Sequence, residues 1–508
     1  MLSVFDKGPS APCPAPFNLA AHVLAPAYRQ PEKTALEIIG PNSTEHWSYG
    51  QIQNAVLGTG TGLLRAGLQP GDRVLMRLGN TVDFPVAFLG AIAAGLVPIP
   101  TSAQLTETET AKIIHDIAPQ AVLRDPAVDS PAHAGEISLQ SLRAFYGLQP
   151  CAYSMGDPDR LAYAVFTSGT SGRPRAVGHA HRAIWARQMM IKGWYDLRPD
   201  DRLLHAGAFN WTFTLGTGLL DPWSIGATAL VLQEGTVPSA IPAVLKQHSA
   251  SIFAAAPGIY RKILKGNTSL DLPDLRHGLC AGEKLSSPLH QAWKSATDRD
   301  LYEAYGMSEC STFISASPAR PSQDGALGCP QKGRKIAILG EEGPLPIGEP
   351  GTIAIHRSDP GLMIGYLNAP QEMQARMQGD WFLTGDQGAM SRDGQIHYLG
   401  RGDDMMNAGG FRVSPLEVET TLSEYPQITQ VACASVEVKQ DAAIIVAFFT
   451  APIEIPVEDI AAFASARLAG YKQPRAYVQL DQLPTGANGK LLRRALPALF
   501  KGQSHDHR

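Results

Sequence analysis

The chain has 508 residues, of which 44% are hydrophobic and 18% charged, a composition typical of a globular protein with more than one core. Its 43 Lys and Arg against 47 Asp and Glu leave a formal net charge of −4, which argues against a nucleic-acid partner because such proteins are usually basic. The six cysteines show no C-x-x-C spacing, so we expect neither a zinc site nor disulfides, and a reducing, cytoplasmic location. The most apolar run, 84–100, contains prolines and is shorter than the roughly 20 residues of a membrane helix, so no membrane span is expected.

The first part of the chain alternates between predicted strands and helices, after a proline-rich lead-in over residues 1–30. Strand and helix alternation predicts an α/β fold with a largely parallel sheet. The predicted elements are a short helix at 18–24, hairpin strands at 33–39 and 45–49, a helix at 49–66, a strand at 74–78, an apolar helix at 84–95 and a strand at 97–100.

The remainder continues this pattern and then changes character. A helix at 183–193 and apolar strands at 201–206, 227–232, 251–255 and 275–280 are followed by a β-rich unit over 326–400. Small and charged residues at 400–404 indicate a domain junction. We therefore predict a large N-terminal domain of layered α/β sheets with a β-rich subdomain over residues 1–400, and a small α+β domain over 404–508.

The stretch after residue 160 carries the clearest chemical signal. An apolar run, 161–166, leads into a hexapeptide of hydroxyl residues and glycines with Arg173 and Arg175 behind it. Glycine permits positive φ angles, so that successive N–H groups turn toward one anion. The loop is neither a Walker loop nor a dinucleotide fingerprint, because it lacks both spacings. The hexapeptide, which we interpret as a polyphosphate loop, is Thr167, Ser168, Gly169, Thr170, Ser171 and Gly172.

This loop resembles the phosphate loop of the AMP-forming acyl-adenylate family, which comprises acyl-CoA and aryl-CoA ligases, luciferases and the adenylation domains of peptide synthetases. Arg175 and Ala176 stand where that family usually has lysine and glycine. Further segments resemble the remaining family signatures in the family's order, from about residue 45 to 495. They are LYEAYGMSE at 301–309, WFLTGDQG at 381–388, GRGDD at 400–404 and NGK at 488–490.

The resemblance implies a role for individual residues. Glu309 would bind magnesium, Ser308 would contact the α-phosphate, and Lys490 would contact both the α-phosphate and the acid. Asp403 would be the hinge within a linker over 401–403, and Gly409 and Gly410 would reach the active site for thioester formation. The ATP site would comprise the hexapeptide with Arg175, Gly282, Glu283, Lys284, Ala304, Tyr305, Gly306, Met307, Asp386 and Arg401, and the acid pocket Phe209, Trp211 and Gly282.

The resemblance thus implies an enzyme that uses ATP, Mg²⁺, coenzyme A and a small or medium apolar acid, aliphatic or aromatic. It is most similar to the short-chain, medium-chain and benzoate-type acyl-CoA ligases. An enzyme that adenylates an amino or aryl acid and loads a carrier protein in trans is the first alternative, although the run 208–212 lacks the aspartate that would pair an amine. A catalytically weak nucleotide-binding regulator is the second, supported only by Arg175 and Ala176. The sequence leaves the acid, the thiol acceptor and the choice between monomer and homodimer open.

Overall fold

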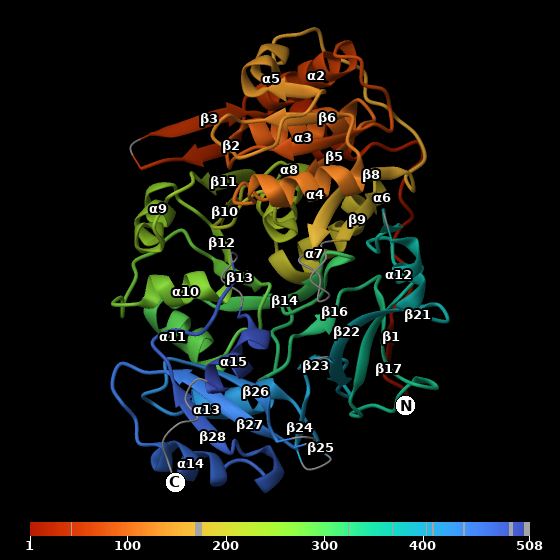
Figure 1. Cartoon of the computed structure of the whole chain (residues 1–508). Coiled ribbons are helices and arrows are strands. Elements are labelled where there is room, and N and C mark those ends of the chain that lie inside the picture. The colour runs from red at the N-terminus through yellow and green to blue at the C-terminus, as the bar shows by residue number, and fades with distance from the viewer. Residues whose placement is uncertain are drawn as a thin grey trace.

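The structure is a computed structural model that describes residues 1–501 except 42, 168–174, 324, 368, 403, 409–410, 440–441 and 487–490. Figure 1 shows a large N-terminal part, made of the upper and middle layers, and a small C-terminal unit below it. Helices and sheets are mixed throughout the large part, as the sequence predicts for its fold class.

A nine-stranded sheet occupies the middle of the large part. Its central strands are parallel, and its outer strands β3, β15 and β16 pair antiparallel. Helices α10 (Pro257–Leu264) and α11 (Ser287–Thr297) cover it through Tyr260 and Trp293, whose rings lie 5.1 and 6.2 Å from that of Phe253. In spatial order the strands are β16 (Cys329–Pro330), β15 (Ser311–Ser315), β14 (Leu301–Met307), β13 (His277–Ala281), β12 (Ile252–Ala255), β10 (Arg202–His205), β11 (Thr228–Leu232), β2 (Thr34–Ile39) and β3 (Thr44–Ser48).

A four-stranded parallel sheet lies above it and shares its core through helix α3 (Asp83–Ala93). Every residue of α3 is buried, because the helix is apolar all round. Among the described residues no helix is long and apolar enough to cross a membrane. The other elements here are β5 (Val97–Pro100), β4 (Arg73–Arg77), β6 (Ala121–Arg124), β7 (Glu136–Ser138), α2 (Tyr49–Arg65), α4 (Glu107–Ile117) and α5 (Leu139–Phe145).

The predicted polyphosphate loop connects two antiparallel strands rather than a strand and a helix. Strand β8 (Leu161–Thr167) pairs with β9 (Arg175–Ala180), so that Thr167 and Arg175 are opposite each other where the loop leaves the sheet. The sequence prediction missed β9, because its small residues show no apolar–polar alternation; all but the first are buried. A short strand, β20 (Gly365–Tyr366), completes this sheet.

The helix predicted over 183–193 is divided into three short pieces. They are α6 (Arg182–Ala186), α7 (Gln188–Met190) and the π-helical turn η2 (Ile191–Tyr195). Asp196 ends the last piece with a left-handed φ of 49°. A second π-helical segment, η3 (Thr214–Leu220), continues into α8 (Asp221–Ile225) and packs beside these pieces.

The β-rich unit predicted over 326–400 is a seven-stranded sheet that also includes residues from the start of the chain. Strand β1 (Val4–Asp6), in the lead-in predicted to be irregular, pairs antiparallel with β17 (Lys335–Gly340). Strand β22 (Trp381–Met390) alternates strictly between buried and half-buried residues, which places Asp386 on its buried face. The other strands are β18 (Gly343–Pro344), β19 (Gly351–His356), β21 (Met377–Gln378) and β23 (Ile396–Arg401).

The C-terminal unit has its own sheet and core. Val418, Leu422, Ile445, Phe449 and Ile460 are central to that core. The elements are β24 (Met406–Ala408), β25 (Phe411–Val413), α13 (Pro415–Ser423), β26 (Gln430–Lys439), β27 (Ala442–Thr450), α14 (Val457–Ser465), β28 (Ala476–Gln479) and α15 (Leu496–Lys501).

Candidate active site

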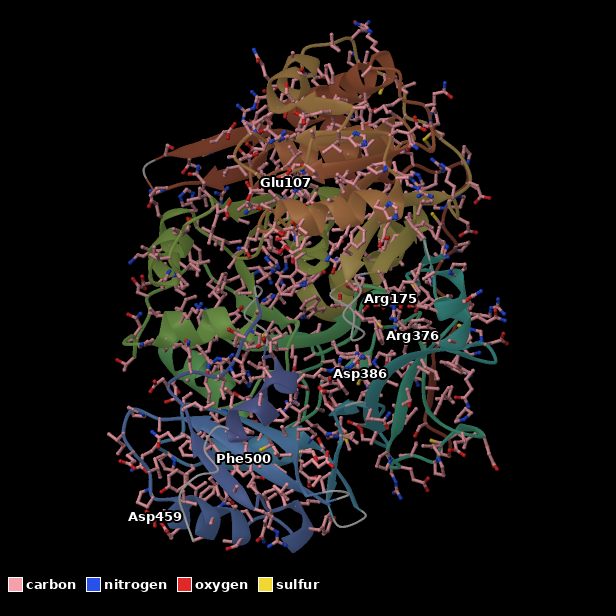
Figure 2. All side chains as sticks on the ribbon, in the orientation of Figure 1. Glu107, Arg175, Arg376, Asp386, Asp459 and Phe500 are labelled. Atoms are coloured by element: carbon pink, nitrogen blue, oxygen red, sulfur yellow. The ribbon has the colours of Figure 1, made fainter. Side chains whose placement is uncertain are left out.

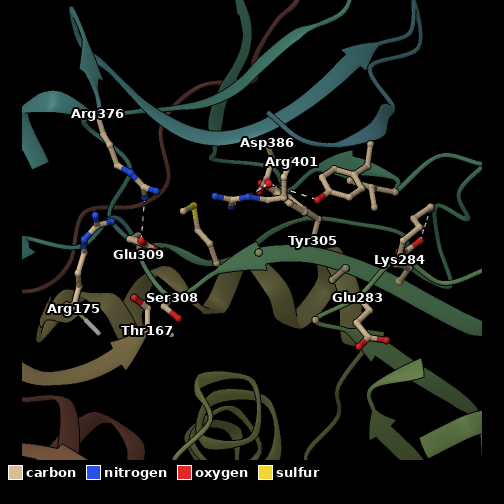
Figure 3. A pocket seen from close by; sticks show the side chains of 17 residues that line it. Thr167, Arg175, Glu283, Lys284, Tyr305, Ser308, Glu309, Arg376, Asp386 and Arg401 are labelled. Atoms are coloured by element: carbon tan, nitrogen blue, oxygen red, sulfur yellow. Dashed lines mark hydrogen bonds and ion pairs between the residues drawn. The ribbon is translucent and has the colours of Figure 1, made fainter. Parts of the chain in front are cut away.

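A cavity of about 370 Å³, here called the large cavity, lies where the sheets of the large part meet. Figure 2 places Arg175, Arg376 and Asp386 together near the middle of the molecule, far from Glu107 above and Asp459 below. All described residues predicted to bind the nucleotide line this cavity, as do Ser308 and Glu309 (Figure 3). The predicted nucleotide residues are Thr167, Arg175, Gly282, Glu283, Lys284, Ala304, Tyr305, Gly306, Met307, Asp386 and Arg401.

One end of the large cavity is built around the Asp386 carboxylate. Asp386 on β22 is paired with Arg401 on β23, and Nη1 of Arg401 lies 3.2 Å from Oδ1 of Asp386. The hydroxyl of Tyr305 on β14 donates a hydrogen bond to the same carboxylate. Burial, together with Asp386, raises the pKa of Tyr305 well above its usual value, so the phenol remains a donor. Asp386 is thereby fixed as an oriented acceptor at the wall of the cavity.

The other end contains two guanidinium and two carboxylate groups. Glu309 is buried, and its Oε1 accepts hydrogen bonds from the hydroxyl of Tyr366 at 2.7 Å and from Nη1 of Arg376 at 3.2 Å. Arg175 forms an ion pair with Glu372 of helix α12 (Pro370–Ala375). Figure 3 shows both guanidinium groups directed toward Glu309. This arrangement supplies positive charge beside a carboxylate.

The donor set at this end fits a magnesium ion that arrives with a polyphosphate. Magnesium is usually held by one or two carboxylates, with substrate phosphates and water completing its octahedral shell. Glu309 is the buried carboxylate available for that role, and the described residues contain no group of three His, Cys, Asp or Glu side chains that would form a separate metal cage.

The segment after β13 forms a further wall of the large cavity. Gly282 has a left-handed φ of 94°, which glycine adopts without strain. Nζ of Lys284 lies 2.6 Å from Oε2 of Glu303 on β14, and the other oxygen of Glu303 accepts a hydrogen bond from the Leu285 N–H at 2.8 Å. Glu283 lies 3.6 Å from Arg261. These contacts anchor the turn to the strand that carries Tyr305.

The aromatic residues predicted for the acid pocket lie outside the large cavity. Phe209 is fully buried, its ring lies 5.2 Å from that of Phe84, and it lines a separate cavity of about 210 Å³. Trp211 is half-buried and packs edge-on against Phe213, with ring centroids 5.1 Å apart. Of the three predicted pocket residues, Gly282 lines the large cavity.

Several predicted site residues lie outside the described residues. They are Ser168, Gly169, Thr170, Ser171 and Gly172 of the loop, the hinge residue Asp403, Gly409 and Gly410, and Lys490. Their flanks are described: Thr167 and Arg175 close the base of the loop, and a bridge between Thr485 and Leu491 brings together the two sides of the segment that contains Lys490.

Sequence reasoning missed four residues that line the large cavity. Arg376 follows α12, in a segment that resembles no signature, and it reaches Glu309 across 67 positions of sequence. Tyr398 on β23 lies with its ring 5.7 Å from that of Tyr305. A lone arginine and a tyrosine in a strand carry no local signal of a site. The remaining two are Glu303 and Leu327.

Comparisons with known proteins agree with this geometry. A 3-hydroxybenzoate–CoA ligase of Aromatoleum sp. (strain CIB) is 28% identical over 531 residues, covering 98% of this chain and 99% of the relative. A mitochondrial acyl-coenzyme A synthetase of Rattus norvegicus is 27% identical, covering 95% and 90%. The crystal structure of an anthranilate CoA ligase in complex with anthranoyl-AMP superposes with a TM-score of 0.87 at 25% identity, covering 96% of this chain and 98% of that one.

Family models match both parts of the chain. The model described as AMP-binding enzyme matches residues 24–367, and the model described as AMP-binding enzyme C-terminal domain matches residues 417–490. The first match alone covers more than half of the chain. The chain therefore belongs to the family of AMP-binding enzymes.

Proposed function

We propose that this chain is an ATP-dependent carboxylic acid–CoA ligase. It joins the acid to AMP with release of pyrophosphate and then transfers the acyl group to the thiol of coenzyme A. The single observation that carries the proposal is the large cavity, where the fixed carboxylate acceptor of Asp386 at one end and the guanidinium groups of Arg175 and Arg376 beside Glu309 at the other face one space. The relatives named above as CoA ligases support the same reaction.

The two ends of the large cavity orient the nucleotide. Asp386 accepts hydrogen bonds from the ribose hydroxyls, with Tyr305 and the turn at 282–284 flanking adenine. The triphosphate then points toward Thr167, Arg175 and Arg376, which supply hydroxyl and guanidinium donors. Magnesium bound with the triphosphate would neutralise its negative charge. Glu309 would hold that ion through its carboxylate, and Arg376 would then donate to a phosphate oxygen.

The first step is the attack of the acid on the α-phosphorus. An oxygen of the carboxylate forms the new P–O bond, and the bond to the bridging oxygen breaks, so that pyrophosphate leaves with the electron pair. The Ser308 hydroxyl donates to an α-phosphate oxygen and Lys490 stabilises the charge that develops there.

The second step is the attack of the coenzyme A sulfur on the acyl carbon. The C–O bond to AMP breaks, AMP leaves with the electron pair, and the thiol proton passes to solvent. We propose that residues 404–508 rotate about Asp403 between the steps and bring Gly409 and Gly410 to the cavity, because hinge residues absorb such φ/ψ changes.

The acid is proposed to be small or medium-sized, with an apolar aliphatic or aromatic body. Trp211 is proposed to limit its length.

A cytoplasmic location is part of the proposal, supported by six cysteines that are all free thiols. Light scattering on the purified chain distinguishes the monomer from the homodimer that the sequence leaves open.

The test is product identity. The purified chain is incubated with ATP, Mg²⁺, coenzyme A and a panel of short, medium and aromatic acids, and the nucleotide and phosphate products are separated. AMP, pyrophosphate and an acyl-CoA are expected in equal amounts, and omission of coenzyme A leaves acyl-AMP on the enzyme. Formation of ADP and orthophosphate, or of no acid-dependent product, would overturn the proposal. If acyl-AMP reacts with a carrier protein and not with coenzyme A, the thiol acceptor is the carrier protein.

A further inference from the structure

A second cavity, of about 20 Å³, adjoins the large cavity at Ser308, which lines both. A volume of this size accommodates one group as large as a water molecule. We call it the small cavity. Because Ser308 is proposed to contact the α-phosphate, the small cavity lies beside the position of the acid, and the inference drawn from it rests on the function proposed above.

The wall of the small cavity contains a buried ion pair. Nε and Nη2 of Arg187 lie 2.8 and 2.6 Å from the two oxygens of Asp221, and the hydroxyl of Tyr195 donates to the same carboxylate at 2.7 Å. The paired geometry neutralises both charges. The remaining terminal nitrogen of Arg187 donates to the hydroxyl of Ser311, which also lines the small cavity.

Two backbone features stand out beside the Arg187 guanidinium. A Cβ atom on Gly216 would lie 2.2 Å from Cζ of Arg187, so only glycine leaves space for the guanidinium at that position. Ser311 has a left-handed φ of 61°, which is strained for a residue with a side chain. An unfavourable backbone angle that persists beside a cavity is a pointer to function.

His179 supplies a hydrogen-bond acceptor without a partner. Its Nε2 lies 2.8 Å from the backbone oxygen of Ser308, and because a carbonyl oxygen only accepts, Nε2 must carry the proton. Nδ1 is therefore the acceptor, and no described residue donates to it. The side chain lines the small cavity, is 3% exposed, and burial lowers its pKa to about 4, so it is neutral at pH 7.

We propose that the small cavity receives one neutral hydrogen-bonding substituent of the acid, a hydroxyl or an amino group on an otherwise apolar body. Such a group donates to Nδ1 of His179 and accepts from the Arg187–Ser311 side. An apolar substituent would leave the buried Nδ1 unpaired, which is unfavourable.

Charged substituents fit less well. A second carboxylate is larger than the small cavity, and both arginines in its wall are already neutralised, Arg187 by Asp221 and Arg334 by Asp359. An ammonium group would face those guanidinium groups without a carboxylate of its own. The acid is thus a monocarboxylic acid that carries a hydroxyl group or an aromatic amino group, because an aliphatic amine would be protonated at pH 7.

The first test needs only the unaltered chain. The specificity constant kcat/KM is measured for benzoate, its three hydroxy and three amino derivatives, and butyrate with its hydroxy derivatives. We expect at least one substituted acid to exceed its unsubstituted parent by about 10²-fold or more, because a site built to bind a hydroxyl rejects the analogue that lacks it. A best substrate without a hydroxyl or amino group overturns the inference but leaves the proposed function intact, whereas absence of AMP with every acid overturns the function itself.

The second test uses a matched pair of serines on β15. Ser311→Ala removes the hydroxyl that faces the small cavity and should lower the ratio of substituted to unsubstituted acid about tenfold. Ser315→Ala is the control, since Ser315 is buried on the same strand but donates to the backbone oxygen of Gly193, away from the small cavity. A selectivity ratio that is the same in Ser311→Ala and in the unaltered chain would show that the small cavity does not bind the substituent of the acid.

Discussion

Nη1 of Arg376 lies 3.2 Å from Oε1 of Glu309, so the carboxylate predicted to bind magnesium is paired with a cation that lines the same cavity. The hydroxyl of Tyr366 shares that oxygen at 2.7 Å. Burial, together with Glu309, raises the pKa of Tyr366, which keeps its hydroxyl a donor. A carboxylate held in this way is oriented, and its arginine partner lines the cavity proposed to receive the triphosphate.

Arg376→Ala is expected to weaken the use of ATP. A hydrogen bond from a charged donor is worth roughly 1.5–3 kcal/mol, which predicts a fall of roughly 10- to 100-fold in kcat/KM for ATP. Inhibition by added pyrophosphate should weaken by a similar factor. Arg357→Ala is the matched control, because Arg357 forms an exposed pair with Asp380 at 3.3 Å. An unchanged KM for ATP in Arg376→Ala would contradict the proposed contact between Arg376 and the triphosphate.

Lys490→Ala is expected to separate the two half-reactions. Loss of one electrostatic partner of a transition state typically lowers the rate by roughly 10²-fold or more. Pyrophosphate release should show that loss, whereas acyl-CoA formation from supplied acyl-AMP should be largely retained. Equal damage to both steps would contradict the predicted role.

Asp403→Pro is expected to impair the thioester step more than adenylation. Proline fixes φ near −65°, so a hinge at this position could no longer rotate. Single-turnover measurements of pyrophosphate and acyl-CoA separate the steps, and normal overall turnover would show that the domains do not rotate about this residue.

Trp211→Ala is expected to shift the acid preference toward longer chains. The indole is half-buried against Phe213, so its removal leaves unfilled volume beside that ring. Each additional buried methylene is worth about 0.8 kcal/mol. A series of straight-chain acids from four to twelve carbons measures the profile, and an identical optimum in the variant would exclude Trp211 as the gate.

The stability of the folded chain should decrease as the pH is lowered below about 6.5, the ordinary pKa of histidine. Burial lowers the pKa of His205 to about 3 and of His179 to about 4, and burial with nearby Arg160 lowers that of His181 to about 3. The unfolded chain therefore binds protons that the folded chain does not. The free energy of unfolding decreases as pH falls from 6.5 toward 4, by up to about 1.4 kcal/mol per pH unit for each histidine.

Urea unfolding at pH 7, 6 and 5 measures this dependence. Nδ1 of His205 accepts a hydrogen bond from the Gly207 N–H at 3.0 Å, and the asparagine in His205→Asn retains an acceptor for it. This variant should reduce the dependence of the unfolding free energy on pH by about the contribution of one histidine. His115→Asn, at an exposed position, is the control. An equal slope in His205→Asn and the unaltered chain would contradict the prediction.

Short sequence patterns were enough to identify several residues of the site. Thr167 was identifiable because an apolar run leads into a hexapeptide of hydroxyl residues and glycines, and Ser308, Glu309 and Asp386 because their segments resemble signatures of the AMP-forming family; all four line the large cavity. Helices such as α2 and α3 were predictable from their periodicity and apolar content. The spacing of apolar residues along the chain determines whether one face of a helix or its whole surface is buried.

The pairing of distant charged residues became visible only in the folded chain. Arg376 reaches Glu309 across 67 positions and Arg187 reaches Asp221 across 34, and no local pattern indicates either pair. Strand β9 was missed for the same reason, because its small residues become a strand only by pairing with β8 and β20. Charge neutralisation and strand pairing depend on long-range contacts, so they follow from the folded chain and not from the residues next to them.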